Sequence, residues 1–261
     1  MTNGQNDSAR SSKWDIVVVT YNSSEDLKKN WSTPFPDNVK IIVVDNDSSD
    51  DTVEVARAMG LVCVQSPNHG LAKSNNIGAN LGEAEFVLFA NPDISLTVEC
   101  LASLEKSLTR NPRSIVAPRL VNDDGVTWQA NARAWPTIPR VLTSRLRPNS
   151  RRAKAYQWPD GDPDWFTGAC IAMTRSDFEE RLHWPEDYFL YYEDVQLCID
   201  ARRAGLKVLL CEDAIAGHGW RRDSTSLASP ATRRHLRSAV KFYSKNPRLA
   251  IGVFGDGVSG R

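Results

Sequence analysis

The first half of the chain alternates short apolar runs with polar turns and amphipathic stretches. Four runs are apolar on consecutive residues, the pattern of strands whose two faces are both covered by helices. They are Asp15–Thr20, Lys40–Asp45, Leu61–Gln65 and Phe86–Ala90. Stretches with helical spacing cover Glu25–Trp31, Asp51–Met59, Leu71–Leu81 and Val98–Leu108. This alternation predicts βαβ units around a parallel sheet.

The second half is less regular. A fifth strand is expected over Ile115–Leu120, and the following segment, Gly125–Pro159, has no acidic residue but is rich in arginine, proline and tryptophan. We expect this segment to be an irregular, basic insertion. Regular structure is predicted to resume over Asp164–Thr174, with a helix Asp194–Ala204, a strand Lys207–Cys211 and a final helix from about Ser229 to Lys245.

The sequence pattern favours a single domain. The sequence has no internal repeat and no low-complexity linker, which favours one domain over residues 14–245. Residues 1–13 are polar and have no apolar segment of the secretory type, so a disordered tail is expected there, and residues 246–261 are expected to be a C-terminal tail.

Composition excludes several classes of protein. The 261 residues include 32 Lys+Arg and 32 Asp+Glu, and this balance argues against a nucleic-acid binder that relies on bulk positive charge. No apolar run approaches the ~20 residues that span a bilayer, so a cytoplasmic protein is predicted. Five cysteines without a C-x-x-C pair disfavour a disulfide framework and a thiolate zinc site.

Charge is distributed unevenly despite the neutral total. From Gly217 onward the chain carries nine lysine and arginine residues against two acidic ones. Because Leu236 and Val240 are interleaved with these basic residues, the final helix could rest on anionic lipid at the inner face of a membrane. A solvated helix face explains the same pattern, and both interpretations stay open.

Polar residues follow three of the predicted strands. Thr20-Tyr21-Asn22, Asp45-Asn46-Asp47 and Asn91-Pro92-Asp93 come directly after the first, second and fourth strand. Ligands of open α/β sheets collect outside the carboxyl ends of the strands, so we expect these loops to share one crevice. Asn, Asp and Pro also form turns, which weakens the signal of any single loop.

Two nucleotide-binding motifs are absent, because neither G-x-G-x-x-G nor G-x-x-x-x-G-K-[ST] follows the first strand. Asn68-His69-Gly70-Leu71 opens a predicted helix whose N-terminus could favour an anion such as a diphosphate.

Taken in order, these segments resemble the inverting glycosyltransferases of family 2, and within them the rhamnosyltransferase-like branch. The matching segments are Val18–Ser23, Val43–Asp50, Asn68-x-Gly70 with Asn75–Gly78, Asn91–Asp93, Gly168-Ala169, Tyr188–Val195, and His218 followed by Ser224-Thr225. The resemblance implies an α/β GT-A fold, with a Rossmann-like, mostly parallel sheet flanked by helices. Residues 14–120 would form its nucleotide-sugar-binding half and residues 121–245 its acceptor side.

The resemblance also implies roles for individual residues. Nucleotide-sugar contacts are implied for Thr20, Tyr21, Asn22, Asp45, Asn76, Asn91 and Asp93, and acceptor-side contacts for Gly168, Ala169 and Glu193. Asp194 would be the catalytic base, and Asp93 with His218 would bind a divalent cation, Mg²⁺ or Mn²⁺. Helix capping by Glu193 and Asp194, and simple packing of His218, are the structural alternatives.

The implied reaction moves a sugar from a nucleoside diphosphate to a hydroxyl group. L-rhamnose from dTDP-rhamnose is the leading donor and a UDP-linked sugar the other option. The acceptor would be a cell-surface glycan, a glycolipid or a secondary metabolite, with a lipid-linked form among the candidates. Gln196 replaces the family's aspartate two residues beyond the base, and Asn91 replaces a carboxylate. A nucleotide-sugar-binding or scaffold protein that has lost catalysis is therefore the alternative hypothesis.

Overall fold

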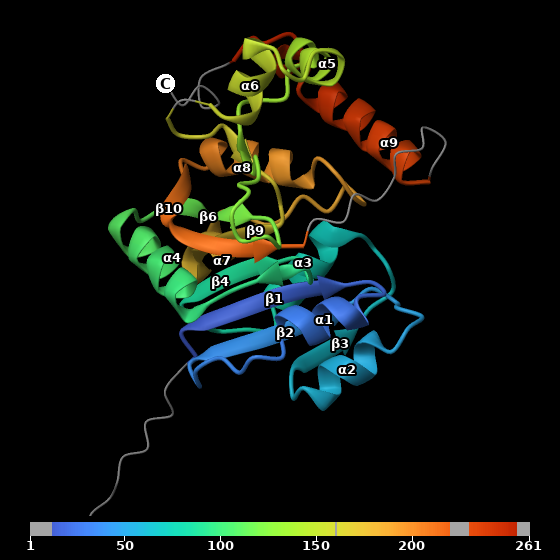
Figure 1. The fold of residues 1–261 in the computed structure, drawn as a ribbon, viewed down its shortest axis with the longest axis vertical. Coiled ribbons are helices and arrows are strands. Elements are labelled where there is room, and N and C mark those ends of the chain that lie inside the picture. Colours follow the sequence, from blue (N-terminus) through green and yellow to red (C-terminus); the bar gives the residue numbers. More distant parts are fainter. Residues whose placement is uncertain (1–11, 160, 220–229, 255–261) are drawn as a thin grey trace, which may run out of the picture.

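The computed structural model describes residues 12–159, 161–219 and 230–254, which form one layer of sheet between helices (Figure 1). Within these residues the main sheet has eight strands in the order β3-β2-β1-β4-β9-β6-β10-β5. The pairs β4–β9, β6–β9 and β10–β5 are antiparallel and the others are parallel. The α/β class is confirmed, and the sheet is mixed.

The predicted βαβ units are present in the first half. The strands are β1 (Trp14–Thr20), β2 (Val39–Asp45), β3 (Val62–Gln65) and β4 (Phe86–Ala90), and the helices are α1 (Ser24–Asn30), α2 (Thr52–Ala58) and α3 (Leu71–Ala79). Thr20 pairs with Asp45 in register, and Val18 pairs with Ala90. The polar residues that follow these three strands therefore lie at one edge of the sheet.

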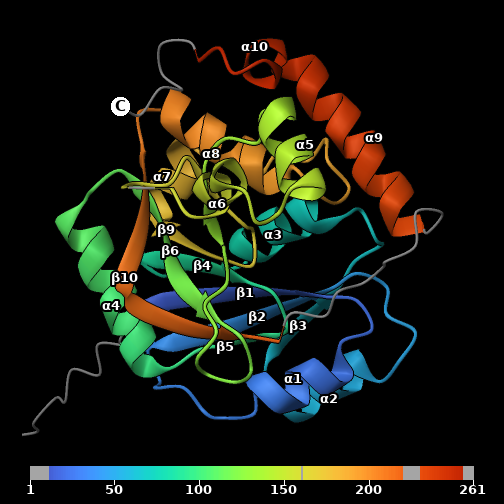
Figure 2. The same ribbon diagram turned by 45° about the horizontal axis from the view of Figure 1, so that its top comes forward.

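Hydrophobic packing covers both faces of the sheet. Val17 and Val19 of β1 belong to one core with residues of α3 and α8 (Glu193–Arg203), whereas Ile16 and Val18 belong to a second core with residues of α1, α2 and α4 (Val98–Arg110). Figure 2 shows α1 and α2 on one side of the sheet and α3 and α8 on the other. This explains why the strands are apolar on consecutive residues.

An antiparallel strand in the middle of the sheet was not assigned by the sequence pattern. β9 (Cys170–Thr174) lies between β4 and β6 (Ser114–Val121), and Cys170 pairs with Ala90. β10 (Lys207–His218) is longer than the predicted strand, because a register shift between Cys211 and Ile215 lets it continue beside β6 and then pair with β5 (Ile94–Ser95).

The basic insertion is more regular than predicted. It contains α5 (Ile138–Leu146) and α6 (Arg151–Gln157), and a short ladder joins β7 (Ala132–Arg133) to β8 (Trp165–Phe166). Thr137 caps α5 by accepting a hydrogen bond from the Arg140 N–H, and Ser150 caps α6 in the same way from Ala153. These local caps, rather than apolar periodicity, define the two helices.

Helical structure continues past residue 245. After α7 (Arg175–Glu180), α8 and β10, the described part of the chain contains α9 (Pro230–Lys245) and α10 (Pro247–Ala250), in which Leu249 and Ala250 are buried. Lys13 is also part of the fold, since its Nζ lies 2.8 Å from Glu105 Oε1. Ser224 and Thr225 lie outside the described residues. None of the helices in the described part of the chain is long and apolar enough to cross a membrane.

Candidate active site

The loops after β1 and β2 are joined by hydrogen bonds. Thr20 Oγ1 donates to Asp45 Oδ1 at 3.0 Å, and the Ser48 N–H donates to Asp45 Oδ2 at 3.0 Å. Asn22 Oδ1 accepts from the Ser49 N–H at 2.8 Å. Asp45 is fully buried, while the Tyr21 side chain is exposed. The Asp45 carboxylate thus braces the two loops, and Tyr21 is the aromatic residue that this edge exposes.

The loop after β4 is fixed from two sides. The Asn91 N–H donates to the Ala169 carbonyl at 2.9 Å, because β9 runs antiparallel and begins beside the end of β4. On the other side the Trp31 indole N–H donates to the Pro92 carbonyl at 2.9 Å. Asn91 and Asp93 are therefore held next to the Gly168-Ala169 segment, about 77 positions away in sequence.

Pairing of β5 with β10 brings Asp93 and His218 together. His218 pairs with Ile94, and the Gly219 N–H donates to the Asp93 carbonyl at 2.9 Å. As a result His218 Nε2 lies 3.5 Å from Asp93 Oδ1. This contact joins two residues that sequence reasoning could relate only by family resemblance.

Gln129 determines the orientation of the His218 ring. Its Nε2 donates to Asn122 Oδ1 at 2.8 Å and to the His218 carbonyl at 3.0 Å, so its Oε1 must be the atom 2.6 Å from His218 Nδ1. An acceptor at that position requires the neutral imidazole to carry its proton on Nδ1. The lone pair of Nε2 then faces Asp93.

The Asp93–His218 pair has the chemistry of a partial metal site. A carboxylate oxygen and an imidazole nitrogen suit first-row divalent cations, and an outer hydrogen bond to the second ring nitrogen is common at such sites. The part of the chain that the structure describes contains no group of three or more His, Cys, Asp or Glu able to hold a metal. The pair would therefore supply two ligands of a larger set.

Asp194 lies in the first turn of α8, beside the segment that leads into β9. Its Oδ2 accepts from the Gly168 N–H at 3.0 Å, and its Oδ1 accepts from the Val195 N–H at 2.8 Å. Tyr191 and Tyr192, which precede the helix, have φ values of 72° and 69°. Left-handed backbone is costly for bulky residues and is concentrated at functional sites. The turn aims the acidic pair at the segment that follows β8.

The two acidic residues differ in environment. Glu193 is buried and its Oε2 has no hydrogen-bond partner. Burial, followed by the neighbouring charge of Asp194, raises the pKa of Glu193 well above its usual range. Burial also raises the pKa of Asp194, although the N–H groups of Gly168 and Val195 and the Arg133 guanidinium oppose the shift. Burial and the neighbouring charge therefore favour the protonated form of Glu193, whereas two N–H groups and the Arg133 guanidinium favour the ionised form of Asp194.

One cavity of about 650 Å³ brings the predicted residues of both halves together. Its lining includes Asn91, Asp93, Gly168, Ala169, Glu193, Asp194 and His218. Thr20, Tyr21, Asn22 and Asp45 are not part of its lining; they belong to the adjoining sheet edge. Gln129 and Arg133 also line the cavity and were missed, because an isolated Gln or Arg in a basic insertion carries no sequence signal.

Asn76 is not part of the lining of this cavity, and its expected contact with the nucleotide sugar stays a prediction. Its Oδ1 accepts from the Trp184 N–H at 2.9 Å, while its Nδ2 donates to the Trp184 carbonyl at 2.9 Å and to Glu186 Oε1 at 3.0 Å. The amide is therefore fully engaged inside the protein. Asn76 anchors the segment that leads to the tyrosine run.

The N-terminus of α3 also differs from expectation. The Leu71 N–H donates to the Phe189 carbonyl at 3.1 Å. Gly70 has a φ of 96°, and a Cβ there would come within 2.3 Å of the same carbonyl oxygen. The start of α3 thus binds the tyrosine run of its own chain, and its first amide is not open to a diphosphate.

Gln196 has a bracing position. It is buried, its Oε1 accepts from Asn246 Nδ2 at 2.9 Å, and its Nε2 donates to Asp200 Oδ1 at 2.9 Å. The bond with Asn246 joins α8 to the start of α10, and the bond with Asp200 lies within α8. Packing therefore accounts for the residue that replaces the expected aspartate.

Comparison with known proteins identifies the kind of site. The family model described as "Glycosyl transferase family 2" matches residues 15–182. The chain is 28% identical over 221 residues to the "Low-salt glycan biosynthesis hexosyltransferase Agl10" of Haloferax volcanii, covering 82% of this chain and 69% of that protein. It is 24% identical over 248 residues to "Rhamnosyltransferase WbbL" of Escherichia coli K12, covering 90% and 94%.

A third relative is the "N-acetylglucosaminyl-diphospho-decaprenol L-rhamnosyltransferase" of Mycobacterium tuberculosis, 25% identical over 218 residues and covering 73% of this chain and 70% of that protein. Among solved structures, "Mannosyltransferase PcManGT from Pyrobaculum calidifontis in complex with GDP-Man and Mn2+" superposes with a TM-score of 0.60 at 19% identity. That match covers 92% of this chain and 65% of the other, a little under two thirds of its length. A TarS structure from S. aureus with UDP-GlcNAc gives a TM-score of 0.58 at 17% identity, covering 91% and 70%. These structural similarities support the architecture expected from the sequence.

Proposed function

The chain belongs to glycosyl transferase family 2 and is a glycosyltransferase with the GT-A fold, and we propose that it transfers a sugar with inversion from a nucleoside diphosphate to a hydroxyl group. The observation that supports this most strongly is the common cavity. Asp93, His218 and Asp194 all line it. A leaving-group site and a base on opposite sides of one sugar are what an inverting displacement requires.

Asp93 and His218 are the residues that would hold a divalent cation in this mechanism. Their oxygen and nitrogen lie 3.5 Å apart, and Gln129 turns the unprotonated ring nitrogen toward Asp93. When bound, the cation would offset negative charge on the departing diphosphate. Because Asn91 stands in place of a carboxylate of the family motif, the site has one negative charge fewer. The diphosphate itself would therefore supply more of the cation's ligands. Both Mg²⁺ and Mn²⁺ suit the pair, and the imidazole favours Mn²⁺.

Asp194 is the proposed general base. As the acceptor oxygen forms its bond to the anomeric carbon, the bond to the diphosphate oxygen breaks and the hydroxyl proton passes to the Asp194 carboxylate. Enclosure raises the pKa of Asp194, which makes it a stronger base, and burial raises the pKa of Glu193 well above its usual range, which disfavours a second negative charge beside it. A base in this position contributes roughly 10²- to 10⁴-fold in rate.

L-rhamnose from dTDP-rhamnose is the donor that we propose. Two relatives are named rhamnosyltransferases, and this supports rhamnose over the UDP-linked alternative. The nucleotide would lie along the edge formed by Thr20, Tyr21, Asn22 and Asp45, next to Asn91. The exposed Tyr21 ring is the surface on which a base could stack.

The acceptor that we propose is a lipid-linked hydroxyl compound reached at a membrane surface. One relative carries a decaprenol compound in its name. α9 exposes Leu236 and Val240, 65% and 64% accessible, beside Arg233 and Arg237. This mixture of apolar and basic side chains suits peripheral contact with anionic lipid.

The alternative is a nucleotide-sugar-binding scaffold without catalysis. It loses support because Gln196 has a packing role, so its presence is no sign of decay. A thermal-shift screen of dTDP-rhamnose and UDP-sugars with Mn²⁺, followed by a transfer assay with and without chelator, separates the two. A ligand at 100 times its Kd should stabilise the protein by about 2.7 kcal/mol. Metal-dependent binding without product formation would favour the scaffold.

A further inference from the structure

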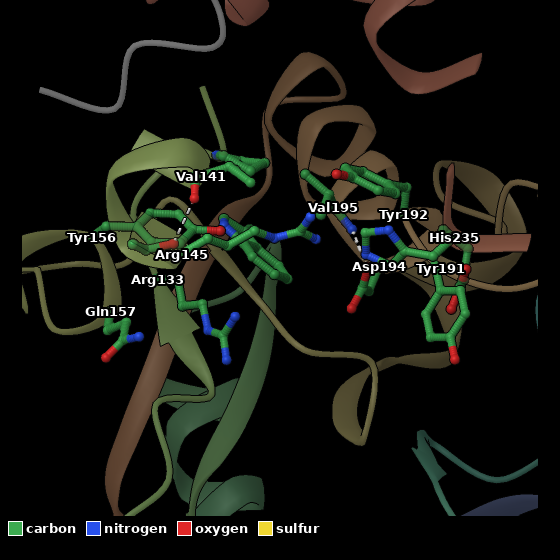
Figure 3. A pocket seen from close by; sticks show the side chains of 14 residues that line it. Arg133, Val141, Arg145, Tyr156, Gln157, Tyr191, Tyr192, Asp194, Val195 and His235 are labelled. Carbon is green, nitrogen blue, oxygen red and sulfur yellow. Dashed lines mark hydrogen bonds between the residues drawn. The ribbon is translucent and has the colours of Figure 1, made fainter. Parts of the chain in front are cut away.

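A second cavity of about 250 Å³ adjoins the acidic pair on the side of the basic insertion (Figure 3). Residues of α5, α6, the tyrosine run and α9 line it. It shares Arg133, Gln157, Tyr191, Glu193 and Asp194 with the main cavity. A molecule whose hydroxyl group reaches Asp194 from this side would therefore occupy the second cavity with the rest of its polar part.

Two arginines, Arg133 and Arg145, line the second cavity. Arg133 and Arg145 lie on one side of the pocket, and Asp194 and His235 lie on the other (Figure 3). Among the described residues, neither arginine has a carboxylate within 4.0 Å. The lining includes two carboxyl groups, those of Glu193 and Asp194, and the Arg133 guanidinium lowers the pKa of Asp194 through its charge. The second cavity therefore holds two guanidinium groups that form no close ion pair within the described part of the chain.

Neutral hydrogen-bond donors accompany the two arginines. Burial raises the pKa of the Tyr156 and Tyr192 phenols, so both hydroxyl groups stay protonated and can donate. Arg133 is held in position because its Nε donates to the Ala130 carbonyl and its guanidinium lies 5.6 Å from the centre of the Trp165 ring. Guanidinium groups form paired hydrogen bonds with phosphate oxygens, and phenol donors can complete such a site.

The helices around the second cavity also expose apolar side chains. Leu142 and Leu146 on α5 are 51% and 78% accessible, and α5 has no buried residue. α9 lies beside α5 (Figures 1 and 2), and the Tyr243 hydroxyl donates to the Pro136 carbonyl just before α5. An amphiphile with an anionic head in the second cavity could thus extend its apolar part along these helices.

We propose that the second cavity binds a phosphate or diphosphate group of the acceptor, through Arg133 and Arg145. This inference rests on the proposed function, since it takes Asp194 as the base that the acceptor hydroxyl must reach. It adds the chemical class of the acceptor, a phosphorylated sugar compound. The phosphate can come from a lipid-linked or a soluble molecule, and both present the same oxygens to the arginines.

The test measures binding without donor or metal. Inorganic pyrophosphate and a short polyprenyl diphosphate are titrated calorimetrically into the full chain in the presence of EDTA. Arg145 lines only the second cavity, so Arg145→Gln is the main variant, and Arg151→Gln, an exposed arginine on α6 outside both cavities, is the matched control. Hydrogen bonds to charged groups predict a loss of about tenfold to a hundredfold for Arg145→Gln.

Each outcome bears on the proposal. Loss of affinity for both probes in Arg145→Gln, with Arg151→Gln unchanged, supports it; tighter binding of the lipid probe by the wild type would identify the lipid-linked source. No binding of either probe, or equal binding by Arg145→Gln and the wild type, overturns it. Asp93→Asn should leave this metal-free binding unchanged, and if Asp93→Asn abolishes it, the probe occupies the donor site and the proposal fails. Because no transfer is measured, failure of the proposed reaction is detected separately.

Discussion

Removal of the Gln129 side-chain amide tests whether this residue prepares His218 for a metal. Gln129→Leu keeps most of the side-chain volume but deletes the contacts of 2.6, 2.8 and 3.0 Å with His218 Nδ1, Asn122 Oδ1 and the His218 carbonyl. His218 then has no partner that holds its proton on Nδ1, and the ring can rotate or change tautomer. Loss of such an outer hydrogen bond lowers metal affinity by about 10- to 100-fold.

That loss corresponds to about 1.4 to 2.7 kcal/mol of binding free energy. Mn²⁺ binding is measured by electron paramagnetic resonance at saturating nucleoside diphosphate, so that catalysis plays no part. Gln65→Leu, which changes an exposed glutamine on β3, is the matched control. The decisive comparison uses His218→Ala, in which the proposed ligand is already absent. There the Gln129 substitution should have almost no further effect.

Two results would refute the reasoning. Gln129→Leu could bind Mn²⁺ as tightly as the wild type. Alternatively, it could weaken Mn²⁺ binding equally with and without the His218 imidazole, which would make the effect a general loss of structure.

Three further predictions concern Glu193, the position of Asp194 and the exposed apolar side chains of α5. Because the pKa of Glu193 is raised in the folded state, the stability that its protonated form contributes is fully present below the unfolded-state pKa of about 4.5 and is lost as pH rises through the folded-state pKa. Glu193→Gln should therefore unfold at a higher urea concentration than the wild type at pH 8 but not at pH 4. Equal unfolding curves at both pH values would contradict the raised pKa. In Gly168→Ala the new Cβ lies 3.3 Å from the Asp194 Cβ, so kcat should fall while nucleotide affinity stays constant, and a fall in nucleotide affinity alone would contradict this. Leu142→Glu should lower the affinity for anionic vesicles, measured by sedimentation, by about tenfold or more. Leu81→Glu, at an exposed site of the nucleotide half, should leave that affinity unchanged. Equal vesicle binding by the two variants would show that α5 does not contact lipid.

The parts of the fold that the sequence predicts are those determined by local pattern. The strands that end at Thr20, Asp45 and Ala90 are marked by consecutive apolar residues, and parallel pairing then requires their polar ends to meet at one edge. The position of β9 could not be predicted from the sequence, because the insertion of an antiparallel strand between β4 and β6 depends on tertiary contacts. The helices of the insertion depend on single capping residues, Thr137 and Ser150, which are weak against a background of prolines and arginines.

The site divides in the same way. Asp93, Asp194 and His218 stand in motifs, and the structure brings them to one cavity. Gln129 acts through a hydrogen bond across 89 positions, which no spacing rule encodes. Asn76 stands in a motif too, but its position inside a tight loop contact gives it a structural role that composition cannot distinguish from ligand binding.

The most direct test of the proposed reaction is the transfer rate of Asp194→Asn, measured together with its affinity for the nucleotide. The asparagine preserves the shape of the side chain and an acceptor for the Gly168 N–H but cannot take the acceptor's proton. Relative to the wild type, the turnover of Asp194→Asn should fall at least about 10²-fold, while its Kd for nucleoside diphosphate with Mn²⁺ should stay within about twofold. Turnover equal to that of the wild type would show that another group is the base.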